Sequence, residues 1–470
     1  MDAFMRDSDA FSWYMERDPV LRSTIVAVAW LERSPDWEVL RSRVDLASRR
    51  APRFRQRVVE ASGMLGTPRW VDDPRFDLAW HFRRIGAPPP HTPRTVVEYA
   101  RHEAEAAFDR ARPLWQFTLI EGLVGGRAAL VMKLHHALTD GIGGIELAML
   151  LFDAQPVVRR RPEGEGTSPA DGDGDAGCRC AGRSRGLARV GAVAVAGARR
   201  ALPWSLQLAL HPLGSVTRVL DDAGSIYRTV APVRRPLSPV MRERGVGRHL
   251  AMLECSLDDL ARAAHAAGGT VNDAFIAAVT GGLRRYHERH GAPVRELRVT
   301  LPISIRGPED PVGGNRITLL RLAVGVADRD PRDRIPAIHR VCQRARHERS
   351  LAYTDAIAGT LNLFPAGVVG GMLRHVDFLA SDVPGFPSAV YLAGARVERY
   401  VAFSPTIGAS MNLTLLSYDG RCTVGVNVDS AAAGDGEVLL SCLAAGFEEV
   451  LALAGPHDPV RVGPGDELAA

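Results

Sequence analysis

The sequence lacks several features that would point to particular classes of protein. Its six cysteines are scattered, and the one close pair, Cys178 and Cys180, has no second half to complete a zinc site. No run of about 18 uncharged apolar residues occurs, so we expect no membrane span. The first residues are acidic and carry no apolar signal core. These absences favour a reducing compartment, and we expect a cytoplasmic protein.

An excess of charge of one sign is missing as well. The 58 Lys and Arg residues nearly balance 54 Asp and Glu residues, for a formal net charge of +4. Such a small excess over 470 residues gives no argument for a nucleic-acid partner. With 46% hydrophobic and 24% charged residues, the chain has the composition of a globular protein, and it is long enough for two or more domains.

One internal segment lacks large apolar side chains almost completely. Residues 156–188 hold mainly Arg, Gly, Asp, Glu, Pro and Ser, which cannot bury enough surface to fold, so we expect a disordered linker. Apolar and basic periodicity returns over 189–230 and predicts two helices with a break at Pro203 or Pro212. The expected division is an N-terminal half 1–155, the linker 156–188, connecting helices 189–245 and a C-terminal half 246–470.

Apolar periodicity predicts alternating strands and helices in both halves, which is an α/β (layered α+β) composition. Strands are expected at 24–30, 115–121, 128–134, 249–256, 297–305, 316–326, 389–392, 396–402, 410–417 and 423–428, and a strand broken by a turn at 68–81. Helices are expected at 37–50, 95–108, 271–290, 335–349, 358–374 and 438–453, and one begins with Asp258-Asp259 in its first turn. Gly125-Gly126 predicts a hairpin between two of the strands.

The most informative stretch that is present reads Leu-His-His-Ala-Leu-Thr-Asp-Gly-Ile-Gly-Gly, over residues 134–144. It follows a strand-like apolar run and precedes a helix-like one, so His135 and His136 are expected where a strand ends and a helix is about to begin. The glycines, of which Gly141 is the first, allow a tight junction. A histidine held there can take a proton from a hydroxyl near neutral pH, since its unperturbed pKa is about 6.5.

Two plainer interpretations compete with this one. A histidine in an apolar run is often a satisfied core residue, although two histidines followed by Asp-Gly at this spacing are less common by chance. A metal site is the other alternative. Successive side chains of a strand point to opposite faces, so His135 and His136 cannot easily share one ion. We therefore expect no metal.

The arrangement His135-His136-Ala-Leu-Thr-Asp140-Gly141 resembles the HHxxxDG signature of the CoA-dependent acyltransferases. That superfamily includes chloramphenicol acetyltransferase, carnitine acyltransferases and peptide-synthetase condensation domains. The resemblance implies two chloramphenicol-acetyltransferase-like halves with the active site at their interface. It also implies that His136 is the general base, that Asp140 is structural and pairs with an arginine, and that Gly141 leaves room for substrate. Arg306 is one candidate for that arginine among many.

Further segments resemble bacterial wax ester synthase/diacylglycerol acyltransferases across nearly the whole chain. No single segment is specific for this family. The order and spacing of all the segments, together with the His-His motif, are specific for it. They are Trp70-Val-Asp-Asp-Pro-Arg-Phe-Asp-Leu-Ala-Trp-His81, Pro113-Leu114-Trp115, Asn272-Asp273, Leu301-Pro-Ile-Ser-Ile-Arg306, Gly314-Asn315-Arg316, Ser381-Asp-Val-Pro384-Gly385 and Asn412-Leu-Thr-Leu-Leu-Ser-Tyr418-Asp-Gly420.

Each of these segments also has a structural interpretation. Pro113-Leu114-Trp115 is more simply a packed strand start than a substrate contact, because Trp supplies buried area. Asn272 is expected to cap a helix, with Asp273 in its first turn. Ser381 or Asn412 could donate to the oxyanion of a tetrahedral intermediate, although a turn or strand role is simpler for both.

One residue departs from the family pattern. Asp382 stands where the family has Asn in Ser-Asn-x-Pro-Gly, and an ionised Asp cannot donate the hydrogen bond that an Asn amide can. If that amide donates in the family, this chain compensates elsewhere or uses a different acceptor.

The resemblance implies an acyl-CoA-dependent O-acyltransferase that esterifies diacylglycerol, a long-chain fatty alcohol, or both. Acyl-CoA is then a co-substrate, and no further cofactor is expected. An acyltransferase of the same fold that acts on a specialised metabolite or a carrier-bound donor is the alternative; a non-catalytic lipid-binding protein would not need the general base. Lipid substrates suggest peripheral contact with the inner membrane face or lipid inclusions. Residues 189–230 could lie in that interface, or could be ordinary helices packed on the core.

Overall fold

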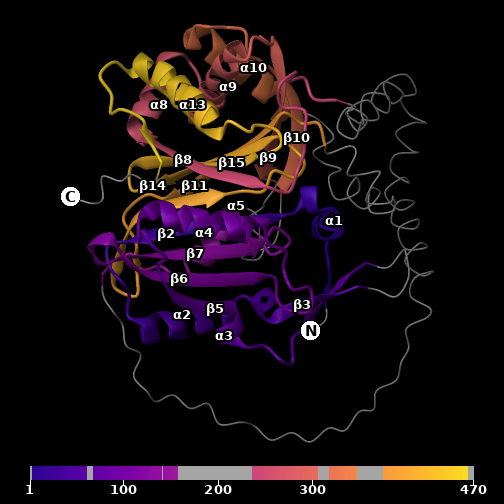
Figure 1. Cartoon of the computed structure of the whole chain (residues 1–470), viewed down its shortest axis with the longest axis vertical. Helices are drawn as coiled ribbons and strands as arrows, with labels where there is room; N and C mark the ends of the chain where they lie inside the picture. The colour runs from indigo at the N-terminus through magenta and orange to yellow at the C-terminus, as the bar shows by residue number, and fades with distance from the viewer. Residues whose placement is uncertain are drawn as a thin grey trace, which may run out of the picture.

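The computed structural model describes residues 3–60, 67–139, 141–156, 235–304, 317–346 and 374–463. These described residues form two halves that lie against each other, one at the bottom and one at the top of Figure 1. Several predictions lie outside the described residues: the cysteine pair Cys178 and Cys180, the linker after residue 156, the connecting helices before residue 235, the helix over 358–374 as far as residue 373, Asp140, Arg306 and Gly314-Asn315-Arg316.

The N-terminal half is built on a mixed sheet. Among the described residues, six strands are hydrogen-bonded in the order β12-β13-β2-β7-β6-β5. Their bounds are β2 Thr24–Leu31, β5 Phe82–Gly86, β6 Trp115–Leu123, β7 Arg127–His135, β12 Tyr391–Leu392 and β13 Ala395–Phe403. A second sheet has the order β1-β4-β3, with bounds Ala3–Phe4, Arg69–Asp72 and Gln56–Val59. The helices of this half are α1 Asp7–Met15, α2 Trp37–Arg50, α3 Leu78–His81, α4 Pro93–Glu105 and α5 Gly141–Ala148, with the 3₁₀ turns η1 Pro19–Leu21, η2 Pro52–Arg55 and η3 Val124–Gly126.

Local sequence explains the elements that lead to the histidines. The predicted hairpin is confirmed: β6 and β7 are antiparallel, and Gly125 and Gly126 between them have φ of 77° and 72°, a region that favours glycine. The helix predicted over 37–50 is also confirmed. It begins after Asp36, whose carboxylate accepts the backbone N–H groups of Glu38 and Val39.

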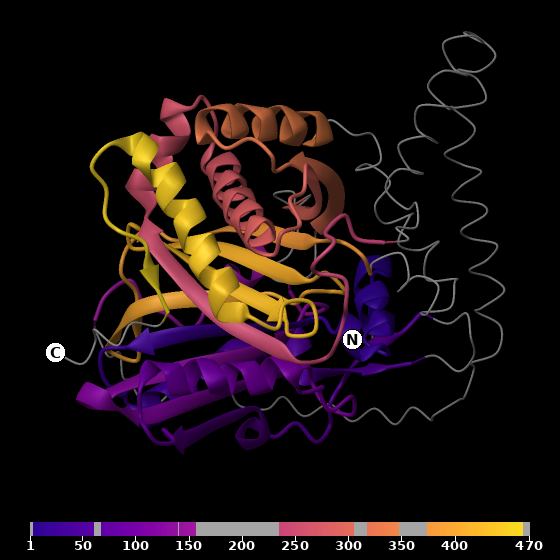
Figure 2. The same cartoon turned by 45° about the horizontal axis from the view of Figure 1, so that its top comes forward.

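The C-terminal half contains a larger sheet covered by helices on one face. Seven described strands follow the order β10-β9-β11-β14-β15-β8-β16. Their bounds are β8 Arg248–Ser256, β9 Glu296–Ser304, β10 Ile317–Gly325, β11 Phe378–Phe386, β14 Met411–Tyr418, β15 Arg421–Asp429 and β16 Arg461–Val462. The helices are α8 Leu257–Ala266, α9 Val271–Arg289, α10 Pro331–Arg346 and α13 Gly436–Leu451, with the 3₁₀ turn η5 Ala452–Ala454. Figures 1 and 2 show these helices on the face turned away from the N-terminal half.

The C-terminal half contributes a hairpin to the sheet of the N-terminal half, which the linear division at residues 155 and 246 did not anticipate. Strands β12 and β13 follow β11 in the chain, yet they extend the N-terminal sheet, where β13 pairs with β2. The chain then returns to the C-terminal sheet as β14. The C-terminal segment therefore completes the sheet that carries the histidines.

Strand β13 also packs against the C-terminal sheet. Gly425 of β15 lies so close to β13 that an added Cβ would be 2.0 Å from the carbonyl oxygen of Ala402. Leu250 and Met252 of β8 share one buried cluster with Val401 and Phe403 of β13. The face of the C-terminal sheet without helices is therefore the face that meets the N-terminal half.

Several predicted boundaries were wrong or incomplete. The broken strand expected at 68–81 is strand β4 followed by the short helix α3, because Asp77 accepts the N–H of Ala79 and starts a helical turn. Helix α1 and strands β5 and β11 were not predicted. Strand β11 contains Pro384 and Gly385, which read as a turn in sequence. Its pairing with β14 is irregular between Val383 and Phe386.

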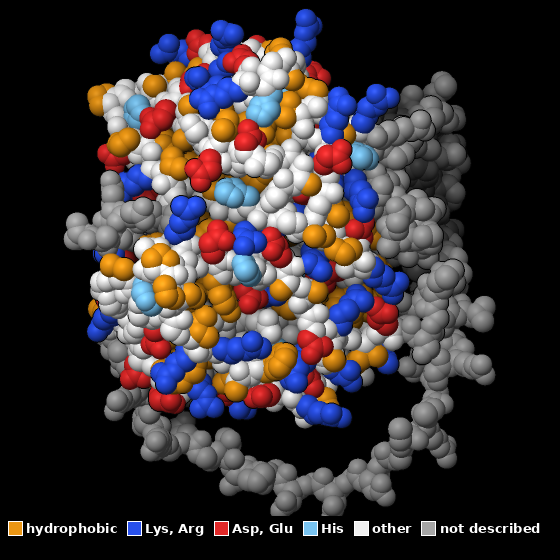
Figure 3. Space-filling model, in the orientation of Figure 1, with side chains coloured by type: hydrophobic (Ala, Val, Ile, Leu, Met, Phe, Trp, Pro, Cys, Tyr) orange, Lys and Arg blue, Asp and Glu red, His pale blue; other side chains and the backbone are white. Residues whose placement is uncertain are grey.

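On the face shown in Figure 3, basic and acidic side chains are interspersed among apolar ones, as the near-balance of charges predicts. Among the residues that the structure describes, none of the helices is long and apolar enough to span a membrane.

Candidate active site

The two histidines occupy the turn between β7 and α5, as the sequence predicted. His135 is the last residue of β7, and α5 begins at Gly141. The backbone of the turn is fixed from two neighbouring segments: the His135 N–H donates to the Leu114 carbonyl at 3.0 Å, and the His136 N–H donates to the Ser23 carbonyl at 2.8 Å. Tertiary hydrogen bonds therefore determine the conformation at both residues.

The His135 side chain lies inside the protein and contacts other parts of the chain through both ring nitrogens. It is completely buried, and its Nδ1 accepts the N–H of Ala137 at 3.0 Å. Its Nε2 lies 3.0 Å from Oε2 of Glu16, which follows helix α1. Because Nδ1 faces a donor and Nε2 faces a carboxylate, we assign the proton to Nε2. Nδ1 is hydrogen-bonded and Nε2 faces the Glu16 carboxylate inside a closed site, so neither nitrogen of His135 is directed at solvent.

Glu16 is the carboxylate partner that sequence reasoning missed. Burial by itself raises the pKa of this carboxyl, but attraction to His135, assisted by Arg110 and Arg22, outweighs burial and lowers the pKa. The side chain is 7% exposed and is expected to be ionised at neutral pH. The only sequence signal for Glu16 was its place in a short acidic segment with no predicted element.

His136 differs from its neighbour because it is only half-buried. The structure ties it down through its backbone, directly after the end of β7, which lies between β2 and β6 in the sheet. Helix α5, which follows the turn, contacts β11 of the C-terminal sheet. His136 therefore lies on a rigid junction that faces the other half.

The Pro113-Leu114-Trp115 segment supports the turn from behind. The Leu114 carbonyl accepts the His135 N–H, while the fully buried Trp115 donates its indole N–H to the Phe54 carbonyl at 2.8 Å. The Trp115 ring also stacks on the His81 ring, with the two ring centroids 4.7 Å apart. The structure thus shows the packed strand start, and it links that start directly to the histidine turn.

Ser381 and Asn412 lie on neighbouring strands, on the sheet face turned toward the N-terminal half. Asn412 pairs with Leu379 in the register of β14 and β11, two residues before Ser381. The Asn412 amide donates to the Pro405 carbonyl at 2.7 Å, which holds the β13–β14 connection in place. Asp382 is exposed and, by strand alternation, points to the opposite face from Ser381.

The Asn272-Asp273 pair requires a correction. The helix begins at Val271 as predicted, so the residue that caps it is Thr270, whose side chain accepts the Asp273 N–H, and Asn272 lies inside the first turn. Asp273 lies in the first turn as predicted. It accepts the backbone N–H and the hydroxyl of Thr270 at 2.9 and 2.7 Å, and His339 approaches it at 2.6 Å.

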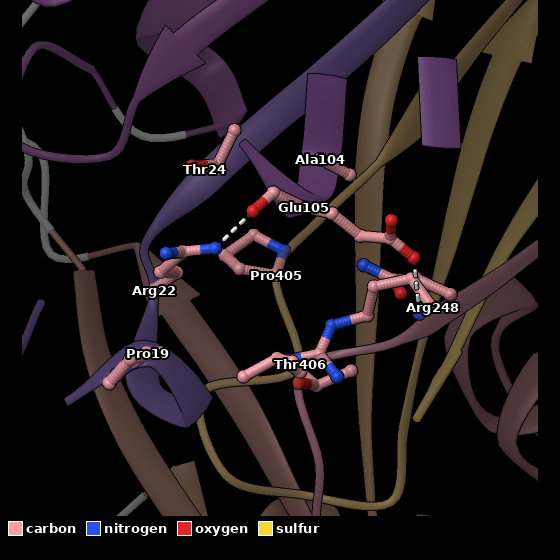
Figure 4. Close-up of a pocket in the computed structure, with 10 residues that line it drawn as sticks. Pro19, Arg22, Thr24, Ala104, Glu105, Arg248, Pro405 and Thr406 are labelled. Atoms are coloured by element: carbon pink, nitrogen blue, oxygen red, sulfur yellow. Dashed lines mark hydrogen bonds between the residues drawn. The ribbon is translucent and has the colours of Figure 1, made fainter. Parts of the chain in front are cut away.

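A small cleft lies at the seam between the halves, beside the start of β2 (Figure 4). Arg22 donates to the Glu105 carbonyl, and the Glu105 carboxylate accepts the Arg248 N–H at 2.8 Å. Buried oxygens of Thr24, Thr406 and Asn427 line the cleft without a hydrogen-bond partner among the described residues. Such oxygens suit ordered water or the polar part of a ligand. Thr24 is paired with His135, so the cleft adjoins the histidine strand.

The described residues hold no cluster of three or more His, Cys, Asp or Glu side chains that could bind a metal ion.

Two models of one protein family match most of the chain. The model of the wax ester synthase/diacylglycerol acyltransferase catalytic domain matches residues 5–275, and that of the WS/DGAT C-terminal domain matches residues 313–450. A protein of Mycobacterium tuberculosis, named provisionally as a diacylglycerol O-acyltransferase, is 37% identical over 94% of this chain and 91% of its own length.

Two solved structures share the fold. The wax ester synthase/diacylglycerol acyltransferase of Marinobacter aquaeolei has a TM-score of 0.63 at 21% identity, covering 97% of this chain and 100% of that one. The starter condensation domain of rhizomide synthetase, solved with C8-CoA and Leu-SNAC, has a TM-score of 0.62 at 14% identity, covering 97% and 95%. The predicted two-domain α/β fold is thereby confirmed.

Proposed function

The chain belongs to the wax ester synthase/diacylglycerol acyltransferase family and is an acyltransferase, and we propose that it esterifies diacylglycerol, a long-chain fatty alcohol, or both, from acyl-CoA. The names of its relatives support diacylglycerol as acceptor. The condensation domain solved with C8-CoA, which shares the fold, supports an acyl-CoA donor. Because such acceptors reside in lipid, we expect the protein to meet them at the inner membrane face or at lipid inclusions, from the cytoplasmic side.

We assign the general base to His136. The observation that carries this assignment is the contrast between the two rings: His135 is completely buried, with its nitrogens directed at Ala137 and Glu16, whereas His136 is half-buried on the same turn. A base must reach the proton that it removes, which supports the half-buried ring of His136 over the closed ring of His135. Asp140 and Gly141 keep the structural roles that the family resemblance implies.

The reaction then proceeds in two proton-coupled steps. His136 takes the proton of the acceptor hydroxyl as its oxygen attacks the thioester carbonyl carbon, and a C–O bond forms. The tetrahedral intermediate collapses, the C–S bond breaks, and the imidazolium gives its proton to the leaving thiolate to release CoA. Atoms and charges balance without another cofactor. Ser381, on the interface face of β11, is a candidate donor to the oxyanion.

The test is ester formation by the purified full chain. Palmitoyl-CoA is supplied with diacylglycerol or hexadecanol, and CoA release is measured together with the mass of the product. His136→Ala is expected to reduce turnover by about a hundredfold or more, as loss of a general base does. Its melting temperature should stay close to that of the parent, because the backbone bond to Ser23 remains. His102→Ala, which removes an exposed histidine on α4, is the matched control and should retain activity.

Each outcome is informative. Ester made by the parent and lost in His136→Ala supports the proposed function and identifies the acceptor. Ester that survives in His136→Ala would place the base elsewhere. No ester with either acceptor would favour an acyltransferase for a specialised metabolite or a carrier-bound donor.

A further inference from the structure

An arginine from outside the sequence motifs contacts the histidine turn. Arg53 lies in η2, which begins at Pro52 and follows helix α2. Its Nη1 donates to the carbonyl oxygen of Ala137 at 3.1 Å, and the same atom lies 3.1 Å from Oδ2 of Asp9. The guanidinium also lies over the Trp70 ring, 5.1 Å from its centroid. Arg53 therefore joins helix α1, the small sheet and the histidine turn.

The Asp9 carboxylate is an unusual anchor because it is completely buried. Its Oδ2 is paired with Arg53, and its Oδ1 has no hydrogen-bond partner among the described residues. Burial raises the pKa of Asp9 to about 6, while Arg53, Arg6 and His135 act in the opposite direction. These three are the charged or titratable groups that face Asp9, from η2, from the residue before α1 and from β7.

Ala137 is the residue directly after His136, and both of its peptide groups are held. Its N–H donates to Nδ1 of His135, and its carbonyl accepts from Arg53. With the His136 N–H bound to Ser23, the backbone on both sides of the half-buried ring is fixed. The bond from Arg53 depends in turn on the ion pair of Arg53 with the buried Asp9.

We propose that Asp9 and Arg53 are positioning residues: Arg53, anchored on Asp9, holds the Ala137 carbonyl and thereby sets the direction of the His136 ring. This inference rests on the proposed role of His136 as general base. A base that is misplaced by a fraction of an ångström loses rate without losing substrate affinity, since proton transfer requires alignment that binding does not.

The arrangement makes positioning depend on pH. Above about pH 6 the Asp9 carboxylate is ionised and pairs with Arg53. Below that pH it is protonated, the ion pair is lost, and the turn loosens. The free energy of unfolding changes with pH in the opposite direction to the positioning of the turn. A carboxyl whose folded pKa is raised contributes most at low pH, and that contribution is lost as the pH rises through the folded value.

The test compares two isosteric variants of two neighbouring ion pairs. Asp9→Asn removes the charge that anchors Arg53. Asp45→Asn is the matched control, because Asp45 pairs with Arg55 of the same 3₁₀ turn at 2.5 Å but has no contact with the histidine turn. For each full-length variant, kcat and KM are measured with palmitoyl-CoA and the working acceptor from pH 5 to 8.5, together with the melting temperature.

For Asp9→Asn we expect kcat to fall roughly tenfold at pH 8 with little change in KM. The ratio of parent to variant kcat should approach one below pH 6, where the parent has lost the same charge. The variant should melt no lower than the parent at pH 8, because it no longer buries a carboxylate. Asp45→Asn should keep the parent's kcat at every pH. Arg53→Lys retains the positive charge but not the planar geometry of the guanidinium. Its kcat at pH 8 should lie between that of the parent and that of Asp9→Asn.

A kcat for Asp9→Asn equal to that of the parent at pH 8, or a ratio that does not change with pH, would overturn the positioning role. The positioning role would also be overturned if Asp9→Asn and Asp45→Asn both lost kcat and melting temperature to a similar extent. These results leave the proposed function standing, whereas a parent that forms no ester, or a fully active His136→Ala, overturns the proposed function itself.

Discussion

The histidine turn and the start of helix α9 are both polar sites at the end of a secondary-structure element, and they are held together in different ways. At α9, Thr270 and Asp273 satisfy each other across one helical turn, and His339 adds one contact. At the turn, the groups that fix His135 and His136 come from Glu16, Ser23 and Leu114. A locally closed site depends on a few consecutive residues. The histidine turn instead depends on segments that only the fold brings together.

This difference predicts where mutations will separate stability from activity. A reciprocal capping interaction stabilises a helix end by about 0.5–2 kcal/mol and acts on little else. A network that holds a candidate base should affect both the fold and the rate, since each lost bond leaves a buried group unsatisfied. The following substitutions test that contrast, from the largest expected effect to the smallest.

Glu16→Gln should have the largest effect of the three. It removes the charge next to Nε2 of His135, at a site where the carboxylate is 7% exposed. We expect unfolding free energy to fall by about 1–3 kcal/mol and turnover to fall roughly tenfold at neutral pH. Chemical denaturation and the CoA-release assay measure the two quantities. Unchanged values of both would show that the buried contact contributes nothing to the turn.

The same variant makes a prediction about acid. Because the pKa of Glu16 is lowered in the folded protein, its contribution to stability is present above its ordinary value of 4.5 and is lost as the pH falls through the lowered value. The difference in unfolding free energy between parent and Glu16→Gln should therefore shrink below about pH 4.5. A difference that stays constant between pH 7 and pH 3.5 would contradict this account.

Thr270→Ala should have an intermediate effect that is confined to stability. It removes the hydroxyl that accepts the Asp273 N–H, and we expect a loss of about 1 kcal/mol with activity close to that of the parent. Thr270→Ser, which keeps the hydroxyl, is the control and should recover most of the loss. A Thr270→Ala protein that is still folded under the assay conditions but has clearly reduced turnover would connect the start of α9 to the reaction.

Asn272→Ala should have the smallest effect on stability. Asn272 is half-buried and is not the capping residue, so we expect a change within about 0.5 kcal/mol. Thermal melting measures this directly. A loss comparable to that of Thr270→Ala would restore a capping role for Asn272, whereas a stable variant with reduced turnover would indicate a contact with substrate.

Sequence reasoning was most successful where a pattern is local. The strands on both sides of Gly125-Gly126 and the helix that begins after Asp36 follow from turn and cap chemistry within a few residues. Strand β11 was missed because Pro384 and Gly385 resemble a turn. The structure accommodates Gly385 by a close approach to β14, where an added Cβ would lie 2.0 Å from the Ser417 carbonyl oxygen.

The partners of the motif could not be predicted for a related reason. Asp9 and Glu16 lie in or next to helix α1, whose hydrophobic periodicity is weak, and nothing near them in the chain indicates a charged contact. Arg53 is one of many arginines in the sequence. Only contacts across 44 and 84 positions of the chain single it out, to Asp9 and to Ala137.

The sequence by itself determined the mixed α/β composition, the strand-to-helix junction at His135 and His136, and the family of acyltransferases, because these depend on residues that lie close together in the chain. The tertiary structure alone decided which histidine is closed in by Glu16, which arginine holds the turn, and that β12 and β13 complete the opposite sheet. Burial, pairing and pKa depend on neighbours in space. Those neighbours become adjacent only when distant segments pack together.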